Sequence, residues 1–168
     1  IGVVETSFSF RSLFSQNAKI DSLFTLLRTD KEDTNKVIHL ADLSGKLMHV
    51  GSYDSAVVYG QKSIELAEKI SYQRGIVSAC NNTGEAYRNL GNFPKALSLQ
   101  LRALDISEKL GDKNRMASSY SSIGNVYYNQ GNNKKYLECQ LSALKLYEET
   151  NNKTGIGWCY NNIGLAYQ

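Results

Sequence analysis

Proline is almost missing from this sequence: the 168 residues contain a single proline, Pro94. Because proline breaks the hydrogen bonds of a helix interior, its scarcity leaves long helices possible along the whole chain. The sequence also contains no run of 18 apolar residues, which is about the length that a membrane-spanning helix needs. The composition therefore permits helices throughout and predicts no membrane insertion within this segment.

Cysteine and histidine are scarce as well. The three cysteines are Cys80, Cys139 and Cys159, the two histidines are His39 and His49, and no C-x-x-C spacing occurs. An odd number of cysteines without that spacing argues against a disulfide framework and against a zinc site. We predict three buried thiols, and we expect neither a metal nor a cofactor.

Charge of one sign is not gathered anywhere in the chain. The formal net charge is +3, and basic residues alternate with acidic ones, as in Lys62, Glu65, Glu68 and Lys69. A nucleic-acid-binding protein usually collects Lys and Arg on one face, so we expect no nucleic-acid partner. The patterns G-x-x-x-x-G-K-[ST], H-E-x-x-H and G-x-S-x-G are missing too. We therefore predict a non-catalytic protein.

What the sequence does contain is an internal repeat with a period of forty residues. Three columns carry it: Gly84, Gly124 and Gly164; Gly51, Gly91 and Gly131; and Tyr87, Tyr127 and Tyr167, with Leu47 in the same column. Agreement across many columns predicts an array of similar structural units. We place repeats at about residues 34–73, 74–113 and 114–153 and a partial repeat at 154–168. They follow a leader at 1–15 and a lead-in helix with its linker at 16–33.

Each repeat is predicted to form two helices. Apolar or small residues recur at three-and-four spacing from Gln73 to Leu90, which predicts a first helix that ends at Gly91 and Asn92. The second helix begins near Pro94, a residue suited to a first helical turn, and continues to Leu110. The fold class predicted from this pattern is all-α.

The glycine column of the first helix predicts close packing. A glycine inside a helix is unfavourable by roughly 0.5–1 kcal/mol against alanine, so its recurrence indicates a tight approach by a neighbouring helix. We expect the small residues Ser63, Ala103 and Ala143 of the second helices to be the partners of this column. Tyr87, Tyr127 and Tyr167 are expected to fill the space beside them.

Several of these residues also form a family signature. Gly84-x-x-Tyr87, Leu90-Gly91-Asn92-Phe93, Ala96 and Ala103 resemble the tetratricopeptide repeat, and the forty-residue spacing is similar to its long variety in kinesin light chains and bacterial signalling proteins. The resemblance covers about residues 34–168. It implies a right-handed α-solenoid of antiparallel helix pairs that binds a protein or peptide.

The resemblance also implies where a peptide would bind. In such arrays the first helix of each pair lines a concave groove. The polar side of these helices gives the expected peptide-binding residues: Asn81, Glu85, Arg88, Asn89, Ser121, Asn125, Tyr128, Asn129, Trp158 and Asn161.

The asparagines of this groove suggest a mode of recognition. Asparagine is a poor helix former, so several on successive helices are unexpected without a role. Their amides both donate and accept, and they could bind the backbone of an extended peptide, with Tyr128 and Trp158 as apolar anchors. The alternative is that the amides bond one another and water and hold no ligand.

The N-terminal part suggests a setting for the array. Residues 16–23 and 30–36 look similar to the lead-in of bacterial sensor proteins, in which periplasmic repeats precede a membrane helix and an output domain. This favours the input or scaffold region of a bacterial signal-transduction protein on the extracytoplasmic side. The alternative is a free-standing adaptor or a cytoplasmic peptide-sensing regulator.

Two expectations concern the ends of the chain. Residues 1–15 carry Phe8, Phe10 and Phe14 around Arg11 and fit the tail of a secretory signal, although no A-x-A cleavage site is present. The alternative is a loose leading segment. Gln168 falls inside the first helix of a fourth pair, whose apolar face would lack a partner. We therefore expect these 168 residues to be part of a longer protein.

Overall fold

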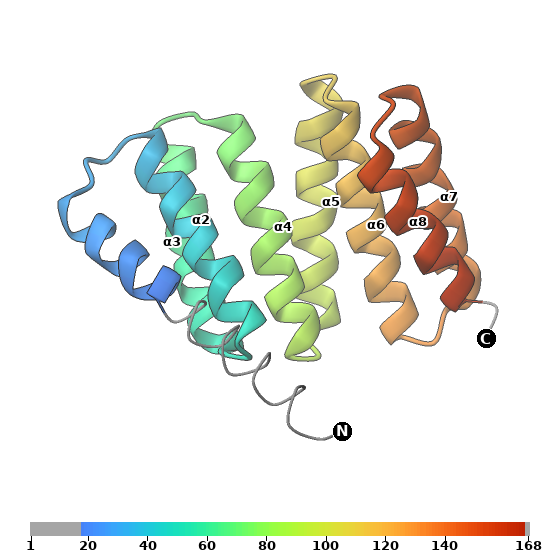
Figure 1. Ribbon diagram of the computed structural model, residues 1–168, viewed down its shortest axis with the longest axis horizontal. Coiled ribbons are helices and arrows are strands. Elements are labelled where there is room, and N and C mark those ends of the chain that lie inside the picture. The colour runs from blue at the N-terminus through green and yellow to red at the C-terminus, as the bar shows by residue number, and fades with distance from the viewer. Residues whose placement is uncertain (1–17, 167–168) are drawn as a thin grey trace, which may run out of the picture.

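The computed structural model describes residues 18–166 as a row of helices that follow one another in chain order (Figure 1). Residues 18–29 form a helical segment, and a short linker leads from it to the paired helices. These are α2 (Thr34–His49), α3 (Tyr53–Lys69), α4 (Gln73–Asn89), α5 (Phe93–Lys109), α6 (Lys113–Asn129), α7 (Asn133–Glu149) and α8 (Lys153–Leu165). The predicted all-α array of helix pairs is confirmed, whereas the expectations for residues 1–15, Tyr167 and Gln168 lie outside the described part.

At the link between α4 and α5, two adjacent residues end one helix and start the next. Gly91 has a φ of 74°, and Asn92 N–H donates to Tyr87 O at 2.9 Å, which closes the end of α4 in the manner of a Schellman motif. The Asn92 side chain then accepts from the backbone N–H of Lys95 and caps the start of α5. The same arrangement recurs at Gly111-Asp112 and Gly131-Asn132, whereas the other three links are Gly51-Ser52, Ser71-Tyr72 and Asn151-Asn152.

The packing partner predicted for the glycine column was wrong. A Cβ on Gly84 would lie 2.6 Å from Gln100 Nε2 and 3.3 Å from the carbonyl oxygen of Ala96. Gly124 faces Gln140 in the same way, at 3.3 Å. The glycine therefore makes room for a buried glutamine of the second helix. Repeat spacing identifies which residues share a helix face, but it does not fix the register between two faces.

The small residues of the second helices pack elsewhere. Ser63 Oγ donates to the backbone carbonyl oxygen of Val37 at 2.8 Å, which places this column against the first turns of the preceding helix. Ala103 and Ala143, which occupy the same column, are fully buried. Their small size lets the second helix approach the N-terminal end of the first helix.

Tyr87 and Tyr127 are half-buried instead of filling the interior. The Lys95 ammonium lies 5.1 Å from the centre of the Tyr87 ring, and the Lys135 ammonium lies 4.9 Å from that of Tyr127. Each ring therefore packs on one side and meets a cation on the other. The third member of the column lies outside the described residues.

The cysteines are all free thiols. Cys80 and Cys159 are buried, as predicted, whereas Cys139 is half-buried. Burial raises the pKa of the Cys80 thiol to about 11, so this thiol stays protonated near neutral pH.

The segment at residues 18–29 packs on the first helix pair. Ile20 is buried in a cluster with Leu43 and Leu47 of α2, and Phe24 meets Tyr59 of α3 edge to face with ring centres 5.6 Å apart. The segment thereby covers apolar surface that a preceding pair would cover inside a longer row.

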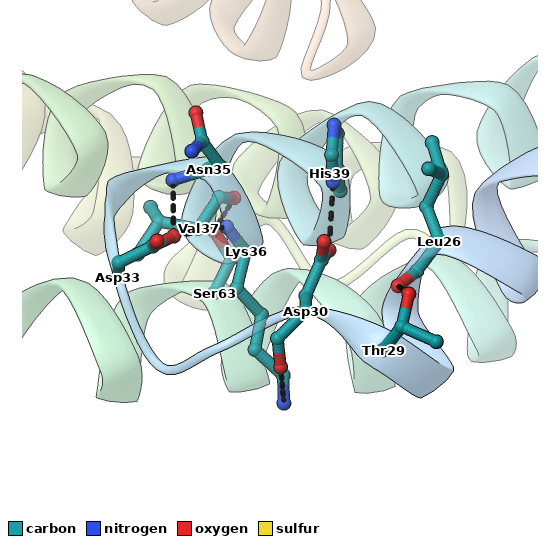
Figure 2. A network of polar contacts seen from close by, with 9 residues as sticks. All are labelled: Leu26, Thr29, Asp30, Asp33, Asn35, Lys36, Val37, His39 and Ser63. Atoms are coloured by element: carbon teal, nitrogen blue, oxygen red, sulfur yellow. Dashed lines mark hydrogen bonds and ion pairs between the residues drawn. The ribbon is translucent and has the colours of Figure 1, made fainter.

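Polar contacts tie the linker to α2, as Figure 2 shows. The Asp30 carboxylate lies 2.7 Å from His39 Nδ1, and the Lys36 ammonium donates to the Asp30 carbonyl oxygen at 3.3 Å. Asp33 caps α2 by accepting from the backbone N–H groups of Asn35 and Lys36. The linker is thus held along the start of the array.

Candidate functional site

The first helices of successive pairs lie next to each other and form one face of the row. α2 contacts α4, and α4 contacts α6, while each second helix packs between two first helices. Two hollows and a narrow crevice follow this face: Ser118 lines both hollows, and Asn125 lines the second hollow and the crevice. The crevice is too narrow to admit a water molecule. The two hollows therefore lie next to each other along the face from α2 to α8, and we call them, together with the crevice, the inner groove.

The two hollows of the inner groove measure about 550 and 380 Å³. The first lies between α2, α4 and the start of α6, and the second lies between α6 and α8. Amide and hydroxyl side chains supply most of their lining. Both volumes fall within the range of about 300–1,000 Å³ that is typical of ligand sites.

The structure brings seven of the ten predicted site residues together in this groove. Six line the two hollows, and one lines only the narrow crevice: Asn81, Glu85, Ser121, Asn125, Trp158 and Asn161 in the hollows, and Arg88 in the crevice. Trp158 is 69% exposed, so its indole is available to a partner.

The other three predicted residues lie outside the inner groove. Asn89 and Asn129 are exposed near the C-terminal ends of α4 and α6, and Asn129 accepts a hydrogen bond from Arg88 at 3.2 Å. The Tyr128 ring packs on Tyr136 of α7, with ring centres 5.0 Å apart. All three residues therefore lie in the last turns of α4 and α6.

Some of the groove amides are hydrogen-bonded within the protein. Ser119 Oγ donates to Asn81 Oδ1 at 3.3 Å, and Gln140 Nε2 lies 3.5 Å from Asn125 Oδ1. Asn161 makes no side-chain hydrogen bond to any residue between 18 and 166. These internal bonds use the side-chain oxygens of Asn81 and Asn125, so their side-chain N–H groups remain available to a ligand.

Two buried glutamines, which were not among the predicted site residues, form the floor beneath these amides. Gln140 accepts from Ser121 Oγ at 3.2 Å and from Asn162 Nδ2 at 3.4 Å. Gln100 donates to the backbone carbonyl oxygen of Asn81 at 3.1 Å, but its own buried Oε1 has no hydrogen-bond partner among residues 18–166. Their forty-residue spacing was a usable signal, since an amide repeated on an apolar helix face needs buried partners.

Ion pairs inside the groove keep its charge close to neutral. Arg88 pairs with Glu85 at 3.2 Å, and Arg115 pairs with Asp112 at 3.2 Å. Arg115 also donates to Ser78 Oγ at 2.8 Å, which joins α6 to α4 across the groove. No repeat signal pointed to Arg115, because glycine occupies the same column in the neighbouring repeats, at Gly75 and Gly155.

The titration behaviour of the chain follows burial and surface ion pairs. Burial raises the pKa of Tyr147, a phenol that lines the groove, and that of Tyr136, which lies near the other end of α7. Lys113 lowers the pKa of the exposed Glu149 carboxyl by hydrogen bonding and by charge. Within residues 18–166, no three His, Cys, Asp or Glu side chains cluster as a metal site would require, and no helix is long and apolar enough to cross a membrane.

Comparison with known families gives a match over the two central helix pairs. A family described as the tetratricopeptide repeat matches residues 76–110 and 116–154, that is, α4 with α5 and α6 with α7. No curated protein sequence matches the chain.

Solved structures resemble the fold over nearly the whole chain. A Signal Transduction ATPase with Numerous Domains from Pyrococcus horikoshii, which has a tetratricopeptide repeat sensor, is 23% identical over 88% of this chain and 23% of its own, with a TM-score of 0.72. A Rap protein complexed with Competence and Sporulation Factor is 18% identical over 95% of this chain and 46% of its own, with a TM-score of 0.82. Nearly identical TPR-like repeats from Podosopora anserina are 14% identical over 98% of this chain and 85% of theirs, with a TM-score of 0.67.

At these identities the likeness establishes the fold alone. The chain spans about a quarter of the Pyrococcus protein and less than half of the Rap protein.

Proposed function

This chain carries tetratricopeptide repeats, and from that premise we propose that it binds an extended peptide segment of a partner protein in the inner groove. The observation that carries the proposal is that the two hollows lie next to each other along the face from α2 to α8, with amide or hydroxyl groups along α4, α6 and α8. An extended peptide exposes a backbone N–H and a C=O at every residue, and these are the groups that such side chains bind.

The charge of the groove supports a peptide of low net charge. Arg88 and Arg115 already have carboxylate partners within the protein, so the groove offers little to a strongly acidic peptide. Trp158 lies at the α8 end of the groove and supplies a large apolar surface for one side chain of the ligand. The ligand class is therefore an extended, nearly neutral peptide with an apolar residue near one end.

The biological role that we propose is the input or scaffold region of a signal-transduction protein. The lead-in of the sequence supports this role, and so does the likeness of the fold to a repeat sensor of a signalling ATPase and to a Rap protein in complex with a factor. A bacterial protein with the repeats on the extracytoplasmic side is our first proposal for the setting. A free-standing adaptor or a cytoplasmic peptide-sensing regulator would use the same groove.

The site can be tested with peptides selected from a random library displayed against the purified chain. The dissociation constant of each selected peptide is then measured for the wild type and for Asn125→Ala with Asn161→Ala. Each lost amide contributes on the order of 1 kcal/mol, so the double variant should bind at least about tenfold more weakly. Circular dichroism checks that the variant keeps its helices.

A matched control removes two amides that lie on second helices, by Gln61→Ala with Asn133→Ala. Both residues are exposed, and neither lines the groove. This variant should bind the selected peptides as the wild type does. Equal binding by the groove variant and the control variant would place the peptide site elsewhere on the chain.

A further inference from the structure

A second cavity lies at the N-terminal end of the row, away from the inner groove. It measures about 410 Å³ and is bounded by residues 18–29, the linker, α2 and α3. None of its lining residues belongs to the hollows of the inner groove. We call it the outer pocket.

The floor of the outer pocket is apolar. Leu40 of α2 and Leu66 of α3 are buried at its base, and the half-buried Leu27 and Tyr59 stand beside them. These side chains also belong to, or pack against, the core cluster of the first helix pair, so the packing of that core fixes their positions. Tyr59 presents an aromatic ring, a surface suited to another aromatic group.

Charged side chains surround this floor, and positive charge is in excess. Lys36, Lys62 and Lys69 face Glu32 and Glu65 around the opening. Lys69 pairs with Glu32, whereas neither Lys36 nor Lys62 pairs with a carboxylate among residues 18–166. The Lys62 ammonium instead lies 5.1 Å from the centre of the Tyr59 ring, directly above the apolar floor.

The linker completes one wall of the pocket and is held in place. Lys36 donates to the Asp30 carbonyl oxygen, and the Asp30 carboxylate contacts His39, as Figure 2 shows. Lys69 contacts Glu32 from α3 and lowers the pKa of its carboxyl. The wall therefore rests on bonds to both helices of the first pair.

We propose that the outer pocket binds a small monocarboxylate with an aromatic or branched apolar body. The apolar body packs on Leu27, Leu40 and Tyr59, and the carboxylate meets the Lys62 ammonium at the opening. The volume of about 410 Å³ suits a small molecule. This site is independent of the peptide site in the inner groove.

Three compounds that share one apolar body test the proposal: 4-phenylbutyrate, 4-phenyl-1-butanol and 4-phenylbutylamine. Each is titrated into the ¹⁵N-labelled chain, and amide shifts are followed by NMR. Binding should be strongest for the carboxylate, with a dissociation constant of about 1 mM, and weakest for the amine. The shifts should concentrate in residues 18–40 and in α3.

Two substitutions at the rim should act in opposite directions. Lys62→Gln removes the positive charge and should weaken 4-phenylbutyrate binding about two- to fivefold, whereas Glu65→Gln removes a negative charge and should strengthen it about twofold. Lys135→Gln is the matched control, because Lys135 also lies over a tyrosine ring but does not line the outer pocket. It should leave binding unchanged.

Several results would overturn the proposal. Equal or tighter binding of the amine would show that the pocket does not select a negative charge. Shifts confined to α6 and α8 would place the compound in the inner groove. Changes of the same size and direction in Lys62→Gln and Glu65→Gln would rule out a role for the rim charges.

Discussion

Gln100 and Gln140 occupy equivalent positions on α5 and α7, but their side-chain oxygens differ in their partners. Asn162 Nδ2 and Ser121 Oγ donate to Gln140 Oε1, whereas the buried Gln100 Oε1 has no donor in the described part of the chain. The residue equivalent to Asn162 one repeat earlier is Ser122, which lines the narrow crevice together with Gln100. Two differences account for the missing donors: Ser122 is shorter than Asn162, and Asn81 stands where Ser121 donates one repeat later.

We predict that Ser122→Asn stabilises the protein. The new amide should reach Gln100 Oε1 as Asn162 reaches Gln140, and satisfying a buried acceptor contributes about 1 kcal/mol. The change should raise the urea midpoint of unfolding. Ser122→Ala, which adds no donor, should not raise it.

The origin of this gain can be checked in a Gln100→Leu background. There the acceptor is gone, so Ser122→Asn should no longer stabilise the protein. A gain that persists in this background would show that the new amide acts through some other contact.

Single residues were the part of the site hardest to predict from sequence. Asn81 and Asn161 were predicted because they lie in register on one face of a repeated helix, and Asn125 because it lies four residues further along the same face. Gln100 was missed because its burial depends on Gly84, which lies opposite it on another helix. Arg115 was missed because it stands once in a column of small residues.

At the scale of elements, the links between helices come in two alternating series. The link that follows each second helix places Ser71, Gly111 and Asn151 at equivalent positions, all with positive φ, at 57°, 65° and 53°. Glycine adopts this conformation without strain and asparagine tolerates it, whereas serine does so less readily. The first link of this series therefore carries local strain.

We predict that Ser71→Gly stabilises the protein by about 0.5–1 kcal/mol, because it removes a Cβ from a left-handed backbone position. Asn151→Gly should change the unfolding free energy less, since asparagine is the better tolerated residue. Gly111→Ser should destabilise, and a Cβ at Gly111 would meet nothing within 4 Å, so its effect reports the backbone alone. Urea unfolding of the three variants measures these differences, and a loss of stability in Ser71→Gly would contradict the argument.

The helices themselves were largely predictable. The first helix of the second repeat was expected over Gln73–Leu90 and spans Gln73–Asn89, because the apolar spacing and the glycine after it are local signals. The contacts between helices were harder to predict, because they join residues that lie far apart in the sequence. In the first pair, Ser44 faces Gly60, with its Oγ 3.0 Å from the position of an added Cβ, whereas in the second pair Gly84 faces Gln100. Small and large residues exchange sides between repeats, so a single column does not reveal its partner.

At the scale of the whole molecule, the chain is a row in which each helix contacts its near neighbours. α2 contacts α3 and α4, and α8 contacts α7, so the two ends of the described part are linked only through the helices between them. Stability in such a row is close to a sum of terms from each pair and from each interface between pairs. The outer pocket and the α8 end of the inner groove therefore belong to different local units.

We therefore predict that the two ends of the row respond separately to mutation. Phe24→Ala removes the half-buried ring that packs on Tyr59 and should lower local stability by about 2 kcal/mol. Hydrogen exchange should speed up in α2 and α3 and change little in α6 and α7.

Tyr136→Ala is the reciprocal variant, because the buried Tyr136 donates from its hydroxyl to the Asn162 carbonyl oxygen at 2.8 Å and so joins α7 to α8. It should speed exchange in α6, α7 and α8 and leave α2 and α3 protected. Equal loss of protection in every helix, for either variant, would mean that the row unfolds as one cooperative unit.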